Sequence, residues 1–131
     1  MTDRPLPVPD RDTAPFWEAA RAGRLRIQRC AGCGQNVFYP RSVCPNCLSQ
    51  ELSWIDCSGR GSVYSFTVVH RTSSEFREEV PFTVGLVELE EGVRMMARLD
   101  LAEPAVGTPV KVSFERVSEE LSLPHFKEVD A

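Results

Sequence analysis

The chain has 131 residues, of which 42% are hydrophobic and 26% are charged, and it carries a formal net charge of −4. These values are typical of a water-soluble protein with one compact domain or two small ones. No apolar run approaches the roughly 20 residues that a membrane-spanning helix needs, so no membrane partner is expected. The basic residues form no run, and because affinity for a phosphate backbone depends on clustered cations, the composition argues against nucleic-acid binding.

Residues 1–24 are predicted to form an N-terminal extension followed by a short helix. Residues 1–12 are rich in proline and charge, which is typical of an extended lead-in without a packed core. This stretch lacks the basic and apolar regions of a secretory signal peptide, so a cytoplasmic location is expected.

The helix is predicted from its capping residues and its apolar stripe. Asp12 or Thr13 is placed to cap its start, and Gly23 is placed to end it. Phe16 and Trp17 lie on the apolar face. Because a helix of about ten residues is marginal alone, this face is expected to pack on the rest of the chain or to dock on a partner protein.

Two Cys-x-x-Cys pairs, Cys30–Cys33 and Cys44–Cys47, constrain the fold more than any other feature. Two such turns facing each other place four thiolates in a tetrahedron around one metal ion. Four ligands leave no open position, so a structural zinc site is expected, with iron as the chemical alternative. Two disulfides or four free thiols are the other interpretations, and a cytoplasmic location disfavours the disulfides.

Residues 25–57 are predicted to form this metal module. Short strands are expected at residues 25–29, at 37–39 and around Leu52 and Trp54. Three short strands bury little area, so the metal is expected to supply much of the folding free energy. Cys57 has acidic and polar neighbours, which favours a small half-buried residue over a reactive thiol.

Residues 58–131 are predicted to be purely β. Strands are expected at residues 63–70, 82–89, 93–101 and 110–117, with a loop at 72–80 and a hairpin turn at 90–92. Several short antiparallel strands favour closure into a small barrel, because closure removes exposed edges. The tail at 121–126 is expected to add an edge strand or to cover a barrel end.

Several ordered motifs together resemble the DUF35 family. They are Phe16-Trp17-Glu18-Ala19, Gly23-Arg24-Leu25, Gln28-Arg29-Cys30, the two cysteine pairs, the run from Gly61 to His70, Pro81-Phe82, Val87 to Gly92, and Leu123-Pro124. The resemblance implies a mainly β chain with a short N-terminal helix, a rubredoxin-like zinc ribbon and a five-stranded OB-fold barrel.

The resemblance also implies a partner rather than a free-standing catalyst. DUF35 proteins accompany thiolase-superfamily enzymes that act on acyl-CoA thioesters, including thiolase-like aldolases that shorten steroid side chains. Another group bridges a thiolase and a hydroxymethylglutaryl-CoA synthase. We therefore expect a non-catalytic accessory subunit of a hetero-oligomer with a thiolase-like enzyme, and a scaffold between two enzymes is the alternative.

The residues themselves agree with a non-catalytic role. The chain has two histidines, His70 and His125, and no motif sets a base against a nucleophile. The residues expected to contact a partner are Phe16, Trp17, His125 and Phe126.

A stand-alone acyl-CoA-binding protein is a second hypothesis, since arginine and lysine suit phosphate groups. The residues proposed to contact CoA are Arg60, Arg71, Arg94 and Arg98, with Lys111 and Lys127 as further candidates. Single-stranded nucleic-acid binding through Tyr64 and Phe66 is a third hypothesis, which the acidic net charge disfavours.

Overall fold

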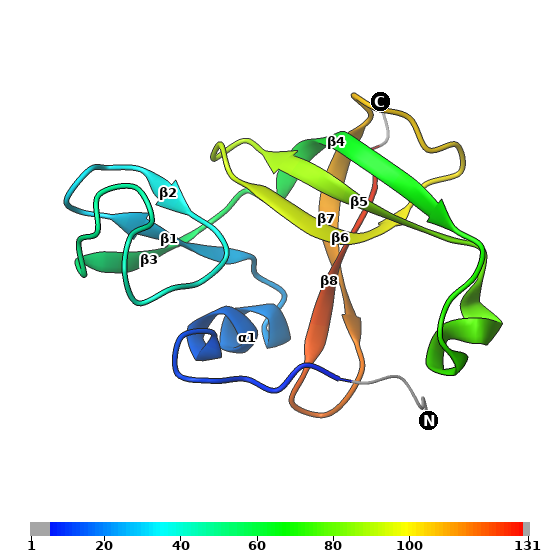
Figure 1. Cartoon of the computed structure of the whole chain (residues 1–131), viewed down its shortest axis with the longest axis horizontal. Helices are drawn as coiled ribbons and strands as arrows, with labels where there is room; N and C mark the ends of the chain where they lie inside the picture. Colours follow the sequence, from blue (N-terminus) through cyan, green and yellow to red (C-terminus); the bar gives the residue numbers. More distant parts are fainter. Residues whose placement is uncertain (1–5, 130–131) are drawn as a thin grey trace.

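The computed structural model describes residues 6–129 and shows a three-stranded sheet joined to a closed five-stranded barrel (Figure 1). The elements are α1 (Ala14–Arg21), β1 (Arg26–Cys30), β2 (Asn36–Val37), β3 (Leu52–Asp56), β4 (Arg60–Val69), η1 (Ser74–Glu79), β5 (Phe82–Leu89), β6 (Arg94–Asp100), β7 (Pro109–Arg116) and β8 (Ser122–Glu128). The predicted fold class, mainly β with a short helix, a four-cysteine ribbon and a barrel, is confirmed.

Helix α1 begins and ends where its capping residues predict. Thr13 is the N-cap, and its backbone N–H donates to the Asp10 carboxylate at 2.9 Å. At the other end Gly23 has φ +80° and its N–H donates to the Ala20 carbonyl at 3.0 Å. A left-handed residue at this position satisfies carbonyls that the helix leaves open, which is why glycine ends it.

The ribbon is a three-stranded antiparallel sheet with β1 in the centre. Strand β3 pairs with all five residues of β1, whereas β2 pairs only through Asn36 and Val37. The expected strand at 37–39 is therefore shorter and shifted, because the chain leaves the sheet after Val37. So small a sheet buries little apolar surface, in agreement with the expectation that a metal holds it.

Strand β8 closes the barrel, so the expectation that the tail adds an edge or covers an end is wrong. The barrel order is β4-β5-β6-β8-β7. β8 runs antiparallel to β7 along its whole length and parallel to β6 through His125, Phe126 and Lys127. Because β8 is paired with one strand on each side, neither of its edges remains open.

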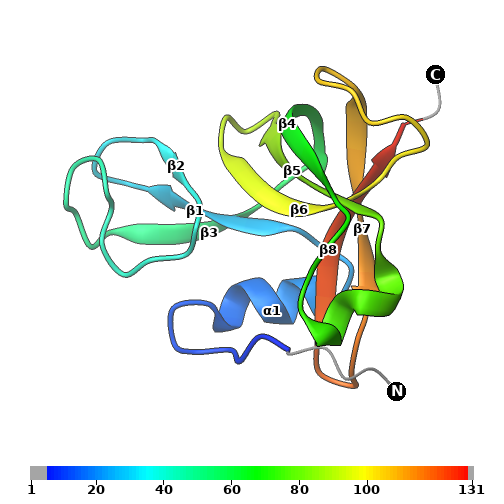
Figure 2. The ribbon, with the colours of Figure 1, turned by 45° about the vertical axis from the view of Figure 1, so that its right-hand side comes forward.

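The segment expected to be a loop at 72–80 contains the 3₁₀ helix η1. Its Phe76 ring lies 6.3 Å from the Phe82 ring at the start of β5. This apolar anchor folds the acidic segment back against the barrel, which explains why a polar stretch is ordered into a helical turn (Figure 2).

One apolar core joins the helix, the base of the ribbon and the barrel. Phe16, Leu25 and Ile27 belong to the same buried cluster as Val63 and Phe126 of the barrel. A separate small cluster lies at the far end of the ribbon around the cysteines. The core therefore crosses the expected boundary between residues 57 and 58, and the division into domains at that point remains a prediction.

A polar joint adds to this core. The Asn36 side-chain amide donates to the Glu91 carbonyl at 2.9 Å, and the Ser58 backbone N–H donates to the Glu91 carboxylate at 3.0 Å. The hairpin between β5 and β6 is thus tied both to the ribbon and to the chain that links the two sheets.

Candidate metal centre and partner-binding surface

The four cysteine sulfurs form one cluster in which all lie within 4.8 Å of one another. The Cys30 and Cys47 sulfurs are 3.5 Å apart, and those of Cys33 and Cys44 are 3.8 Å apart. A tetrahedron with metal–sulfur bonds of about 2.3 Å has sulfurs about 3.8 Å apart. The observed spacing therefore fits one tetrahedral ion, and both distances are far longer than the disulfide bond of about 2.05 Å.

The two cysteine turns repeat one backbone design. In the first, the Gly34 N–H donates to the Cys30 carbonyl at 2.7 Å, and in the second, the Leu48 N–H donates to the Cys44 carbonyl at 2.9 Å. The fifth residue of each turn is left-handed, with φ +77° at Gly34 and +66° at Leu48. Glycine adopts this conformation at little cost, whereas at Leu48 it costs a residue with a side chain about 1–2 kcal/mol.

The electrostatics of the cluster favour a bound cation. The pKa of Cys33 is lowered to about 6, chiefly because the backbone N–H of Gln35 hydrogen-bonds its sulfur. The pKa of Cys47 is raised to about 12: the Ser49 backbone lowers it, but the Cys30 thiol and burial outweigh that contact. Four thiolates at this spacing repel one another unless a positive ion lies between them.

The fit of donors, spacing and turns indicates a structural metal ion. All four tetrahedral positions are filled by protein sulfur, so no position remains for water or substrate. Cys57 lies outside the cluster. Burial, followed by the charges of Glu91 and Asp56, raises its pKa to about 12, which agrees with the prediction that it is not a reactive thiol.

A second candidate site is an apolar groove of about 600 Å³ beside α1. It lies between the helix, the turn after β2, the η1 segment and strands β6 and β8. Among the residues that line it are Trp17, Tyr39, Phe76, Met96 and Leu123. Tyr39 and Met96 are 55% and 70% exposed, and exposed apolar side chains gathered in one concavity are typical of a protein or ligand contact surface.

The structure separates the four residues that were expected to contact a partner. Phe16, Trp17 and His125 all line the groove, although Phe16 is only 5% exposed. Phe126 is fully buried in the barrel core. A partner contact through Phe126 is therefore incompatible with the closed barrel, because strand alternation points this side chain inward between His125 and Lys127.

His125 is held by two carboxylates from neighbouring strands. Its Nδ1 lies 3.5 Å from the Asp100 carboxylate, and its Nε2 lies 3.1 Å from the Glu115 carboxylate. Both ring nitrogens face carboxylates and only 9% of the residue is exposed, so the imidazole presents little surface to a substrate.

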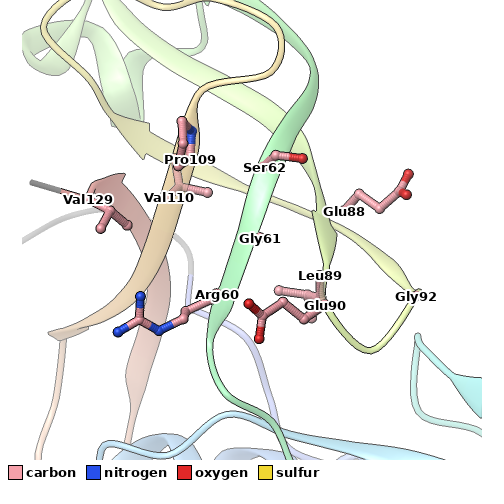
Figure 3. A pocket seen from close by; sticks show the side chains of 10 residues that line it. All are labelled: Arg60, Gly61, Ser62, Glu88, Leu89, Glu90, Gly92, Pro109, Val110 and Val129. Atoms are coloured by element: carbon pink, nitrogen blue, oxygen red, sulfur yellow. The ribbon is translucent and has the colours of Figure 1, made fainter. Parts of the chain in front are cut away.

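The four arginines expected to contact CoA do not converge. Arg94 pairs with Glu88 and stacks 3.8 Å from the Tyr64 ring centroid, while Arg98 pairs with Glu79 and stacks over Phe82. The remaining two lie at opposite ends of β4: Arg71 follows it, and Arg60 begins it. Arg60 lines a depression of about 460 Å³ between β4, β5 and β7, at the ends of β4 and β5 that lie away from the groove (Figure 3).

The sequence missed two features of these surfaces. Phe76 and Met96 line the groove but come from segments with no motif, and only the fold brings them beside α1. Glu91 lies in a turn that the sequence predicts correctly, yet nothing in the sequence indicates that it contacts the ribbon.

Two family models match most of the chain. One describes the rubredoxin-like zinc ribbon domain of ChsH2 and matches residues 17–53, and the other describes the C-terminal OB-fold domain of ChsH2 and matches residues 54–115. A DUF35 domain-containing scaffold protein of Methanothermobacter thermautotrophicus is 36% identical over 73% of this chain and 75% of its own length. The chain belongs to the DUF35 family.

The most informative solved structure is that of an Ltp2-ChsH2(DUF35) aldolase. One of its chains is 37% identical to this chain with a TM-score of 0.83, and the match covers 94% of this DUF35 chain and 98% of that one. A probable enoyl-CoA hydratase alpha subunit of Thermomonospora curvata is 39% identical over 95% of this chain.

This DUF35 chain spans 40% of that hydratase subunit. It likewise spans 35% of a 3-oxo-4,17-pregnadiene-20-carboxyl-CoA hydratase alpha subunit of Mycobacterium tuberculosis, to which it is 42% identical. Within residues 6–129, the structure contains no helix that is long and apolar enough to cross a bilayer.

Proposed function

We propose that this DUF35 protein is a non-catalytic accessory subunit of a thiolase-superfamily complex that acts on acyl-CoA thioesters, with retro-aldol cleavage of a steroid side chain as the reaction of its partner. The observation that carries this proposal is the match over nearly the full length of both chains to a subunit of the Ltp2-ChsH2(DUF35) aldolase. The burial of His125 between two carboxylates and the four-cysteine metal centre support a role without chemistry of its own.

The partner-binding surface in this proposal is the apolar groove beside α1. Trp17 from the helix and Met96 from the barrel face the same concavity, and Met96 is 70% exposed. Desolvated aromatic and methionine side chains are typical of the centres of protein interfaces. The ribbon forms one wall of the groove, so loss of the metal is expected to weaken docking by disordering that wall. We propose that the metal is zinc and that the protein is cytoplasmic. A colourless preparation that contains one zinc ion per chain tests the identity of the metal.

The test is co-expression and co-purification with a thiolase-like enzyme related to Ltp2, followed by a retro-aldol assay of the complex. Met96→Glu is expected to abolish co-elution by placing a charge in the groove. Val106→Glu is the matched control, because Val106 is 68% exposed but lies in the loop between β6 and β7. Full activity of the partner alone, unchanged when this chain is added, would overturn the proposal.

A scaffold that bridges two enzymes is a second candidate, and the archaeal relatives favour it. A DUF35 domain-containing scaffold protein of Methanocaldococcus jannaschii is 34% identical over 70% of this chain and 68% of its own length. Mass measurement of the purified complex separates the two proposals: an accessory subunit is found with one kind of enzyme, and a bridge is found with two.

A further inference from the structure

Three basic side chains from three neighbouring strands form a row on the outer face of the barrel. Arg60 of β4 pairs directly with Lys111 of β7, and Lys111 pairs directly with Lys127 of β8. Residues directly opposite in a sheet point to the same face with Cβ atoms about 5 Å apart, so the three cations line up over roughly 10 Å. Lys111 and Lys127 are the two lysines of the whole chain.

The row is an unfavourable arrangement for the isolated protein. Like charges directly opposite in a sheet destabilise it. Within residues 6–129, none of the three cations forms an ion pair. All three residues are exposed, and the neighbours on one side of the row, Ser62 and Pro109, carry no charge.

Acidic residues adjoin both ends of the row, with Asp100 beside Lys127 and Glu90 beside Arg60. Asp100 follows Lys127 in the same row on β6, and its carboxylate faces His125 at 3.5 Å. Glu128 accepts a hydrogen bond from the Ala102 backbone at 2.9 Å. Glu90 lines the depression beside Arg60, but the Arg60 side chain extends the other way, toward β7 (Figure 3).

From this juxtaposition we propose that Arg60, Lys111 and Lys127 form a binding site for an anion with two or more phosphate groups. Neighbouring cations in the row are about 5 Å apart, a spacing that suits linked phosphate groups. Each charge-assisted contact is stronger than a neutral hydrogen bond, and the bound anion also removes the repulsion between the cations. A free pyrophosphate and the phosphates of a nucleotide-linked thioester share this chemistry. The site goes beyond the proposed function, since docking through the groove does not require it.

The test is titration calorimetry of the full chain with inorganic pyrophosphate and with CoA at low ionic strength. Saturable binding is expected, and Lys111→Gln, which removes the central cation, is expected to weaken it at least tenfold. Arg21→Gln is the matched control, because it removes one exposed positive charge from the last turn of α1 and is expected to change affinity less than twofold. Equal affinities for pyrophosphate and CoA would show that the phosphate groups alone are sufficient for binding. Tighter binding of CoA would show that the site recognises phosphates attached to a nucleotide.

Two outcomes would overturn the proposal: no saturable heat with either anion, or equal weakening by Lys111→Gln and Arg21→Gln. Thermal denaturation gives an independent readout. Without ligand, Lys111→Gln is expected to melt at or above the temperature of the unmodified protein, because repulsion is relieved; a lower melting temperature would instead assign Lys111 a structural role. Co-elution with the thiolase-like partner is expected to persist in this variant, so failure of the anion site is distinguishable from failure of the proposed function.

Discussion

The ribbon and the barrel of this DUF35 protein are both β structures, but they differ in the interactions that stabilise them. At the distal end of the ribbon the buried residues are Cys30, Val37 and Cys44, and strand β2 has two residues. The barrel closes on itself and buries residues from every strand. One region therefore depends on bonds to a metal and the other on burial of apolar surface.

This difference predicts that the two regions respond to different perturbations, although they share the core around Leu25 and Ile27. The two regions are also joined by hydrogen bonds of Asn36 and Ser58 to Glu91. These bonds are expected to set how strongly unfolding of one region destabilises the other.

The largest expected effect is that of Cys44→Ser or of metal chelation. Losing a tetrahedral ion removes on the order of 10 kcal/mol of apparent binding free energy from the ribbon, so residues 26–56 are expected to unfold while residues 60–128 stay folded. Two-dimensional amide NMR spectra measure both regions at once. Cys57→Ser is the control and is expected to leave metal content and spectrum unchanged; simultaneous loss of all signals would show that the two regions form one cooperative unit.

Phe126→Ala perturbs the other region. Removing a fully buried aromatic ring is expected to lower the free energy of unfolding of the barrel by about 3–5 kcal/mol, with the metal still bound to the ribbon. Denaturant titration followed by circular dichroism, together with zinc quantification, measures the two effects. Phe126→Leu is the milder variant if the first does not fold, and an unchanged midpoint in both would contradict the burial argument.

The sequence was sufficient to predict the ribbon, because the spacing of the cysteines specifies a metal site locally. It was also sufficient for the helix ends and for most barrel strands. It failed for β8, because a closing strand is defined by neighbours that are distant in sequence, and the Pro124-His125 stretch shows no clean alternation. The groove was missed for the same reason. Arg60, Lys111 and Lys127 were among the candidates for CoA contact, but their alignment in one row depends on which strands become neighbours.

The joint between the regions is expected to contribute less. Asn36→Ala removes a hydrogen bond of 2.9 Å to the Glu91 carbonyl and should cost about 1 kcal/mol. Its distinctive result is uncoupling: chelation should then lower barrel stability less than it does in the unmodified protein. Gln50→Ala, an exposed ribbon residue, is the control, and identical coupling in both variants would show that the apolar core alone connects the regions.

The smallest expected effect lies inside the ribbon, where the two turns differ at one position. Leu48→Gly should relieve the left-handed strain and tighten metal binding, whereas Gly34→Ala should introduce that strain and weaken it, each by roughly 1 kcal/mol, which corresponds to about fivefold in affinity. Competition with a chromophoric chelator measures both. Changes of the same sign would indicate that side-chain contacts, rather than φ, decide the stability of the turns.

The position of β8 in the barrel has a consequence for synthesis of the protein on the ribosome. All four metal ligands have been translated once Cys47 is complete, so the ribbon can load its ion and fold while the rest of the chain is still being made. The barrel cannot close until Ser122–Glu128 emerges and enters between β6 and β7. During that interval β6 and β7 each expose an open edge, and a nascent chain stalled there would be the form of this protein most prone to aggregation.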